Sequence, residues 1–166
     1  QDRKTAPTGT SFAGLVHNAL ADGECLWSGQ QHIVGYDLWN LRGMLCTADA
    51  ARILGKEEEA RELLADAKDY RAVIDAACKA TGLAYLPPSW ETVGTHWGNT
   101  ETLWPTELFD RDEPRVVATS RHVREEFAGG FIEGTLQWKG SGSKEALPPY
   151  IGTYTTMKAL PHGRHE

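Results

Sequence analysis

The sequence has little of what several common functional classes require. Only three of its 166 residues are cysteines, they form no Cys-x-x-Cys pair, and no apolar run approaches the roughly 20 residues of a membrane-spanning helix. Lysine and arginine are scattered along a chain of net charge −6, so no basic patch is present to neutralise phosphates. We therefore expect no disulfide scaffold and no nucleic-acid or membrane partner. The absence of a signal-like start favours a soluble cytoplasmic protein, with secretion left open.

Signatures of metal and cofactor chemistry are also missing. The six histidines show neither His-Glu-x-x-His spacing nor a Cys/His ligand pattern. No glycine-rich phosphate loop follows a strand, and no serine stands in a nucleophile elbow. We expect neither a metal ion nor a cofactor.

Hydrophobic periodicity predicts helices that are separated by long loops. Apolar residues recur at helical spacing over about 11–21, 36–53 and 56–80. Gly55 ends the second of these runs, which predicts an antiparallel helical hairpin with the third. Weaker patterns predict helices over about 100–109, where Pro105 must kink or shorten the helix, behind Asp112 and Pro114, and over about 149–160. The helix behind Asp112 would close a second hairpin.

No segment shows the sustained two-residue alternation of a strand, and the glycine-rich stretch GGFIEGTLQWKGSGSKEALPP is predicted to be a loop. We therefore predict an all-α domain over residues 11–160, preceded by a flexible polar arm at 1–10 and followed by a tail at 161–166.

Aromatic and glycine-rich loops lead into the predicted helices at three places. Their sequences are HIVGYDLW at 32–39, THWGNTETLW at 95–104 and LPPYIGTY at 147–154. Repeated helical hairpins with long loops on one side can form a toroid, in which the inner helices begin around a common depression. The sequence therefore predicts aromatic side chains around such a depression.

The chain also resembles a known family. YDLWNLRGMLCTADAARILGKEEEARELLADAKDYR, HWGNTETLWPTELF, GGFIEG and LPPYIGTYTTM are similar to the later part of the (α/α)6 toroid of six-hairpin glycosidases, over roughly residues 27–160. The resemblance implies a partial toroid of about three hairpins, whose apolar flanks would be uncovered. Either the missing half of the ring or a homo-oligomer partner would then complete it. The start at Gln1 is consistent with a processed chain or an excised piece.

The resemblance implies hydrolysis of a glycosidic bond by a general acid and a general base. Inverting enzymes of this kind hold two carboxyl groups about 6.5 to 9.5 Å apart. Asp37, between Tyr36 and Trp39, is similar to the general acid at the start of an inner helix, and Glu133 in GGFIEG is similar to the general base. The simpler interpretation of Asp37 is that a carboxylate in the first turn of a helix complements the helix dipole.

Tryptophans in loops, together with nearby polar residues, suggest a saccharide-binding wall, because indole faces stack on the apolar faces of sugar rings. The candidates are Trp27, Gln30, His32, Tyr36, Trp39, Trp90, Glu91, His96, Trp97, Asn99, Glu101 and Trp138. Each tryptophan could instead anchor the core, and Glu101 could simply complement the dipole of the helix predicted at 100–109. The alternative to a hydrolase is a non-catalytic helical-repeat module that binds carbohydrate or protein through the same loops.

Overall fold

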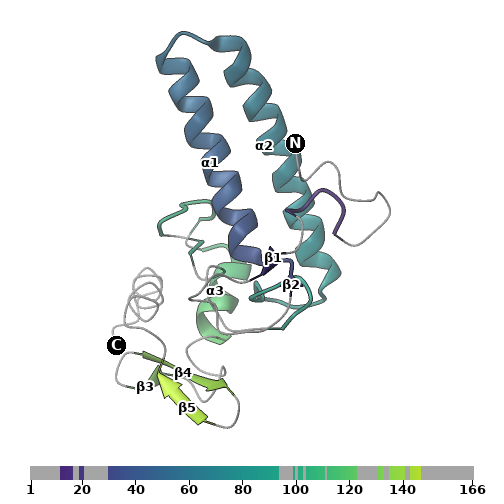
Figure 1. Cartoon of the computed structure of the whole chain (residues 1–166), viewed down its shortest axis with the longest axis vertical. Coiled ribbons are helices and arrows are strands. Elements are labelled where there is room, and N and C mark those ends of the chain that lie inside the picture. The colour runs from purple at the N-terminus through teal and green to yellow at the C-terminus, as the bar shows by residue number, and fades with distance from the viewer. Residues whose placement is uncertain are drawn as a thin grey trace.

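Two long antiparallel helices dominate the structure (Figure 1). The computed structural model describes residues 12–16, 19–20, 30–93, 99, 101–102, 104–110, 112–122, 131–132, 135–140 and 143–146. Helix α1 spans Val34–Ile53 and helix α2 spans Glu57–Ala80. Gly55 makes the turn between them with a φ of +70°, a conformation that glycine adopts without steric cost. The predicted helical hairpin is confirmed.

The hairpin packs along a stripe of apolar side chains. Leu38, Leu41 and Ala48 of α1 are buried, as are Tyr70 and Ile74 of α2. The first turn of α2 carries three glutamates, and basic residues stand in the last turn of both helices, so the charges complement the helix dipoles. Cys46 and Cys78 are free thiols, and no bridge joins the two helices.

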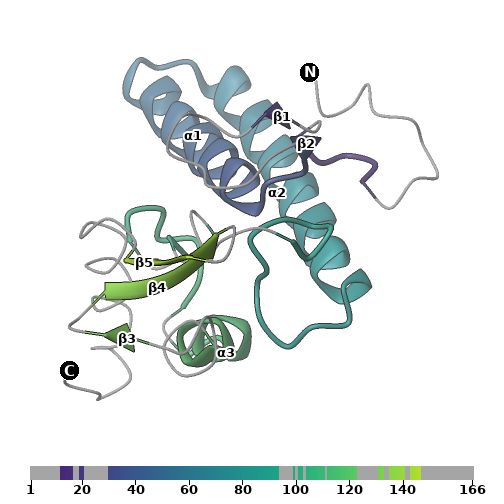
Figure 2. The same cartoon turned by 60° about the horizontal axis from the view of Figure 1, so that its bottom comes forward.

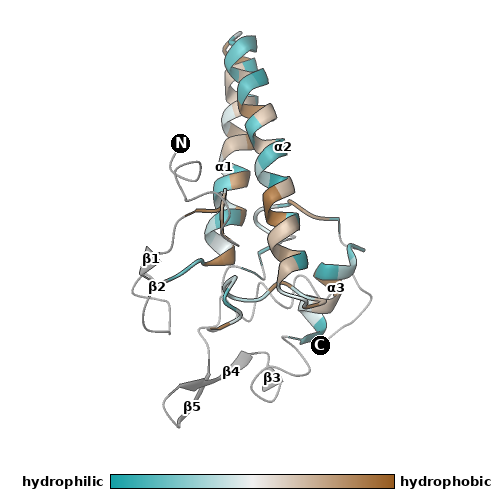
Figure 3. Cartoon of the chain, turned by 90° about the vertical axis from the view of Figure 1, so that its right-hand side faces the viewer, coloured by the Kyte–Doolittle hydropathy of each residue, from teal (hydrophilic) through white to brown (hydrophobic). Residues whose placement is uncertain are grey.

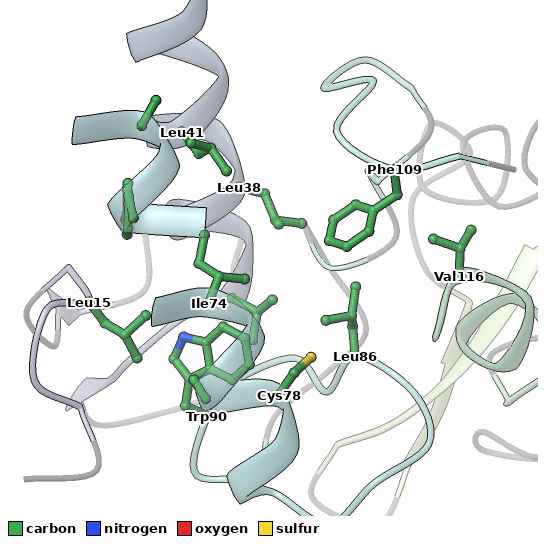
Figure 4. Packing of buried hydrophobic residues seen from close by; sticks show 13 residues of the cluster. Leu15, Leu38, Leu41, Ile74, Cys78, Leu86, Trp90, Phe109 and Val116 are labelled. Atoms are coloured by element: carbon green, nitrogen blue, oxygen red, sulfur yellow. The ribbon is translucent and has the colours of Figure 1, made fainter. Parts of the chain in front are cut away.

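The hydrophobic core lies where α1 begins and α2 ends. Leu15, Leu86, Trp90, Phe109 and Val116 enter it from segments outside the hairpin (Figure 4). The opposite end of the hairpin projects away from the other elements (Figure 3), and Ile53 and Leu54 at its tip are 86% and 72% exposed. The core therefore fixes the loops at one end of the hairpin only.

Helix α3 spans Pro114–Arg121 and begins where Pro114 predicts it. It lies beyond the core end of the hairpin, together with an antiparallel sheet (Figure 2). The sheet has the strand order β3-β4-β5, with β3 at Phe131–Ile132, β4 at Thr135–Gly140 and β5 at Ser143–Ala146. The register pairs Trp138 with Glu145. These strands lie where a loop was predicted, because the alternation in this stretch is too short and too polar to show as a strand pattern.

The prediction of a helix at 11–21 is wrong. Residues 12–15 form turns, and β1 (Ala19–Leu20) pairs with β2 (Gln30–Gln31). Gly14 has a φ of +83°, and a β-carbon there would lie 3.1 Å from Val73 Cγ2. The backbone of this segment therefore leaves the helical region in order to pack against α2.

The helix predicted at 100–109 is also absent from the described residues of that range, which form turns, bends and irregular backbone. Pro105 has no N–H to donate, and Glu107 has a φ of +50°. The second hairpin is consequently not formed by the described residues. The helix predicted at 149–160, the arm at 1–10 and the tail at 161–166 lie outside them.

Helix remains the main regular structure of the part that is described, as predicted, and no strand there exceeds six residues. None of α1, α2 and α3 combines the length and the apolar composition that crossing a bilayer would require.

Candidate functional site

Asp37 is a buried carboxylate at the core end of the hairpin that accepts three hydrogen bonds. It lies in the first turn of α1 and is 0% exposed. Its Oδ1 accepts hydrogen bonds from the backbone N–H of Val16 at 2.9 Å and from the hydroxyl of Tyr70, and its Oδ2 accepts one from Trp90 Nε1 at 2.7 Å. One side chain therefore joins the segment at 12–16, α1, α2 and the loop at 81–93.

Burial has the largest effect on the pKa of the Asp37 carboxyl group. Loss of solvation raises the pKa of Asp37 above its ordinary value, although the donors from Trp90, Tyr70 and Val16 and the charge of His32 act in the opposite direction. A carboxyl group with a raised pKa keeps its proton to higher pH, which is what a general acid needs. The group can act on a ligand only if the ligand reaches it, and both oxygens are occupied by protein donors.

A histidine–glutamate pair lies next to this carboxylate. His32 Nδ1 is 2.6 Å from Glu91 Oε1, and the backbone N–H of His32 also donates to Glu91 Oε2 at 3.0 Å. The imidazole stacks on Phe12 with ring centroids 4.0 Å apart and an interplanar angle of 8°. Both side chains are partly exposed. Glu91 thus fixes the ring orientation of His32, as a carboxylate does for a histidine that transfers protons or binds a polar ligand.

The loop at 81–93 is held against the start of α1 by main-chain contacts. Trp90 N–H donates to the carbonyl of His32 at 2.9 Å, Val34 N–H donates to Pro88 at 3.2 Å, and Ile33 forms a bridge with Ser89. These bonds set the position of both Glu91 and Trp90. Trp90 is buried and its indole N–H is used by Asp37, so the ring acts as a core anchor, the alternative weighed for it from the sequence.

Trp39 is a partly exposed tryptophan near the start of α1. It is 42% exposed, and its Nε1 donates to Glu101 Oε2. Glu101 is buried, and its main-chain carbonyl accepts from Thr106 N–H and Oγ1. The interpretation of Glu101 as a residue that complements a helix dipole is wrong, because no helix begins there. Glu101 instead fixes the orientation of the Trp39 ring.

A second exposed tryptophan belongs to the same loop as Glu101. Trp104 is 46% exposed. The loop is tied to α1 by the ion pair of Arg42 with Glu107 at 3.2 Å and to α2 by Arg71 Nη1, which donates to the carbonyl of Leu108 at 2.7 Å. We use the name aromatic surface for the two exposed tryptophans, Trp39 and Trp104, together with the buried Glu101 that bonds Trp39.

The other candidates differ in where they lie. Tyr36 is partly buried on α1, and its carbonyl accepts from Asn40 Nδ2 at 2.7 Å. Asn99 is fully buried and donates to the carbonyl of Leu86 at 2.6 Å, so it supports the loop from inside. Gln30 lies in β2 and Trp138 in β4. Trp27, His96, Trp97 and Glu133 lie outside the described residues.

Sequence reasoning missed four participants. Tyr70 stands on the apolar stripe of α2, and Phe12 and Val16 stand in a segment predicted to be helical, so none of them carried a signal of contact with Asp37 or His32. Trp104 could have been found, because it ends the aromatic stretch THWGNTETLW.

Within the described part of the chain, no group of three or more His, Cys, Asp or Glu side chains is arranged to hold a metal ion. Comparison of the chain with protein-family models, with curated proteins and with solved structures gives no match.

Proposed function

We propose that this chain is part of a carbohydrate-active protein and that the aromatic surface binds saccharide. One observation carries the proposal: the indole N–H of Trp39 is held by a buried carboxylate, while the residue remains 42% exposed. A ring whose orientation is already fixed loses little conformational freedom when a ligand stacks on it. Indole faces suit the apolar faces of pyranose rings.

The finer form of the proposal is a glycoside hydrolase of the six-hairpin, (α/α)6-toroid kind, in which Asp37 is the general acid and Glu133 the general base. Its support is the sequence resemblance and the raised pKa of Asp37, which suits an acid that protonates a leaving oxygen. Because Asp37 is fully buried, a glycosidic oxygen would reach it only after Val16 or Trp90 gives way.

The second candidate is a non-catalytic module that binds carbohydrate through the same surface. It is favoured by the bonding of Asp37, whose two oxygens are engaged by protein donors from three segments. In this case Asp37 joins the segments and takes no part in chemistry.

The projecting hairpin suggests where further helical hairpins would pack in a toroid. Apolar side chains at its tip are largely exposed. Further helical hairpins, from a longer chain or from a second copy of this one, would cover them in a toroid.

Saccharide binding is tested by calorimetric titration of neutral gluco-, manno- and xylo-oligosaccharides into the wild-type chain and three variants. Trp39→Ala and Trp104→Ala should each weaken binding about threefold to tenfold through lost stacking. The control Val93→Ala removes an apolar side chain of similar exposure, 49%, and should leave affinity unchanged. Absence of binding across the panel, or equal losses in all three variants, would refute the proposal.

Hydrolysis is tested on whichever oligosaccharide binds. If the chain is the hydrolase, sugar is released by the wild-type chain and release is lost in Asp37→Asn while binding persists. Binding without any release by the wild-type chain assigns the non-catalytic role.

A further inference from the structure

A groove of about 270 Å³ lies between α1, α2 and the loop at 104–110, and no residue of the aromatic surface lines it. Its walls are mainly aliphatic, and two cations of α2 stand at its edge. The residues that matter for its chemistry are Leu41, Leu45, Leu64, Leu108, Lys68 and Arg71. Because the groove is mainly apolar, it offers few hydrogen bonds to a polyol and favours a hydrocarbon.

The charges at the edge of this groove do not cancel. Glu107 is already paired with Arg42 at 3.2 Å. Arg71 uses Nε toward Asp75 at 3.4 Å and Nη1 toward the carbonyl of Leu108 at 2.7 Å. Lys68 has no ion-pair or hydrogen-bond partner in the part of the chain that is described.

One positive charge is therefore left over at the edge of an apolar groove, in a chain whose net charge is −6. Lys68 and Arg71 are three residues apart on α2 and so lie on the same face of the helix. The Nη2 group of Arg71 has no hydrogen-bond partner among the described residues. Together, the Lys68 ammonium and this N–H group can donate to the two oxygens of one carboxylate.

We propose that this groove binds a small amphipathic anion, with its carboxylate at Lys68 and Arg71 and its hydrocarbon chain against the leucines. The volume is just below the ~300 to 1,000 Å³ that is usual for ligand sites, which selects a short chain over a long fatty acid. The site is independent of the saccharide proposal, because it shares no residue with the aromatic surface.

The test uses sodium octanoate, with 1-octanol and acetate as probes that lack the charge and the chain. Each is titrated into isotopically labelled wild-type protein, and the methyl resonances of Leu41, Leu45 and Leu64 are followed. We expect saturable shifts of these methyl groups with octanoate, weaker binding of octanol and no saturation with acetate. Octanoate affinity should fall about threefold to fivefold in Lys68→Gln, while octanol affinity stays the same.

Lys79→Gln is the matched control, because Lys79 is an exposed lysine of the same helix outside the groove. It should bind octanoate as the wild-type chain does. The proposal is overturned if octanoate fails to saturate, if it binds no tighter than octanol, if Lys68→Gln and Lys79→Gln weaken it equally, or if the shifted methyl groups lie outside the groove.

Discussion

Replacing Tyr70 with Phe should destabilise the chain by removing a single atom. The Tyr70 hydroxyl donates to Asp37 Oδ1, and both side chains are at most 1% exposed. At a pH above the folded-state pKa of Asp37 the carboxyl group is ionised, and hydrogen bonds to charged groups contribute about 1.5 to 3 kcal/mol to stability. Because Val16 N–H still donates to the same oxygen, we expect a loss in the lower half of that range, about 2 kcal/mol. For a chain of this size the melting temperature should fall by about 4 to 8 °C.

Urea denaturation followed by circular dichroism gives the free energy of unfolding, and a double-mutant cycle attributes the loss to the contact. In the Asp37→Asn background the same hydroxyl meets a neutral amide, so Tyr70→Phe should cost about 1 kcal/mol less there. If the loss is below about 0.5 kcal/mol in the wild-type background, or equal in both backgrounds, Asp37 does not stabilise the fold through this bond.

Three further outcomes are expected. Gly14→Ala should lower the free energy of unfolding by about 1 to 2 kcal/mol, because the φ of +83° disfavours any side chain. Gly43→Ala, in open space on α1, should raise it by about 0.5 to 1 kcal/mol. Urea denaturation midpoints compare the two variants, and equal effects would contradict the reasoning. Burial raises the pKa of Asp37, so the folded state holds a proton that the unfolded state releases above pH 3.8. The unfolding free energy of the wild-type chain relative to Asp37→Asn should therefore be highest below that pH and decline as pH rises through the folded pKa; a rising difference in paired urea titrations would contradict this. Finally, replacing both Ile53 and Leu54 with Ser should reduce self-association, measured by sedimentation velocity, without loss of stability, because both side chains are largely exposed. A wild-type chain that stays monomeric at high concentration would contradict the proposal that a partner covers these side chains.

The hairpin could be predicted because its information is local. The apolar spacing of α1 and α2 repeats over several turns, and Gly55, with a φ of +70°, lies in the turn that joins them. The same spacing at 11–21 misleads, because Leu15 is buried against distant elements while Gly14 takes a left-handed conformation. The loop holding Glu101 departs from a helix because Pro105 cannot donate, because Glu107 takes a φ of +50°, and because the buried Glu101 carboxylate is held by Trp39 of α1.

The sequence indicates individual residues of the candidate site, but only part of how these residues contact one another. The Asp37 carboxylate, chosen for its place in an aromatic helix start, receives donors that stand 21, 33 and 53 residues away in sequence, and no local pattern encodes such contacts. Trp39 and Glu101 were named separately, and only the fold reveals that one holds the other.

The indole N–H resonances offer the most direct test that Trp39 and Trp104 form a saccharide-binding surface. Trp39 and Trp90 both donate to buried carboxylates, but Trp39 is 42% exposed and Trp90 only 6%, so Trp90 is an internal control. In a heteronuclear titration with the neutral oligosaccharide panel, assigned through single Trp→Phe variants, the account predicts saturable shifts at Trp39 and Trp104 and none at Trp90. Indole signals of Trp39 and Trp104 that stay fixed at saturating ligand, or a shift confined to Trp90, would contradict it.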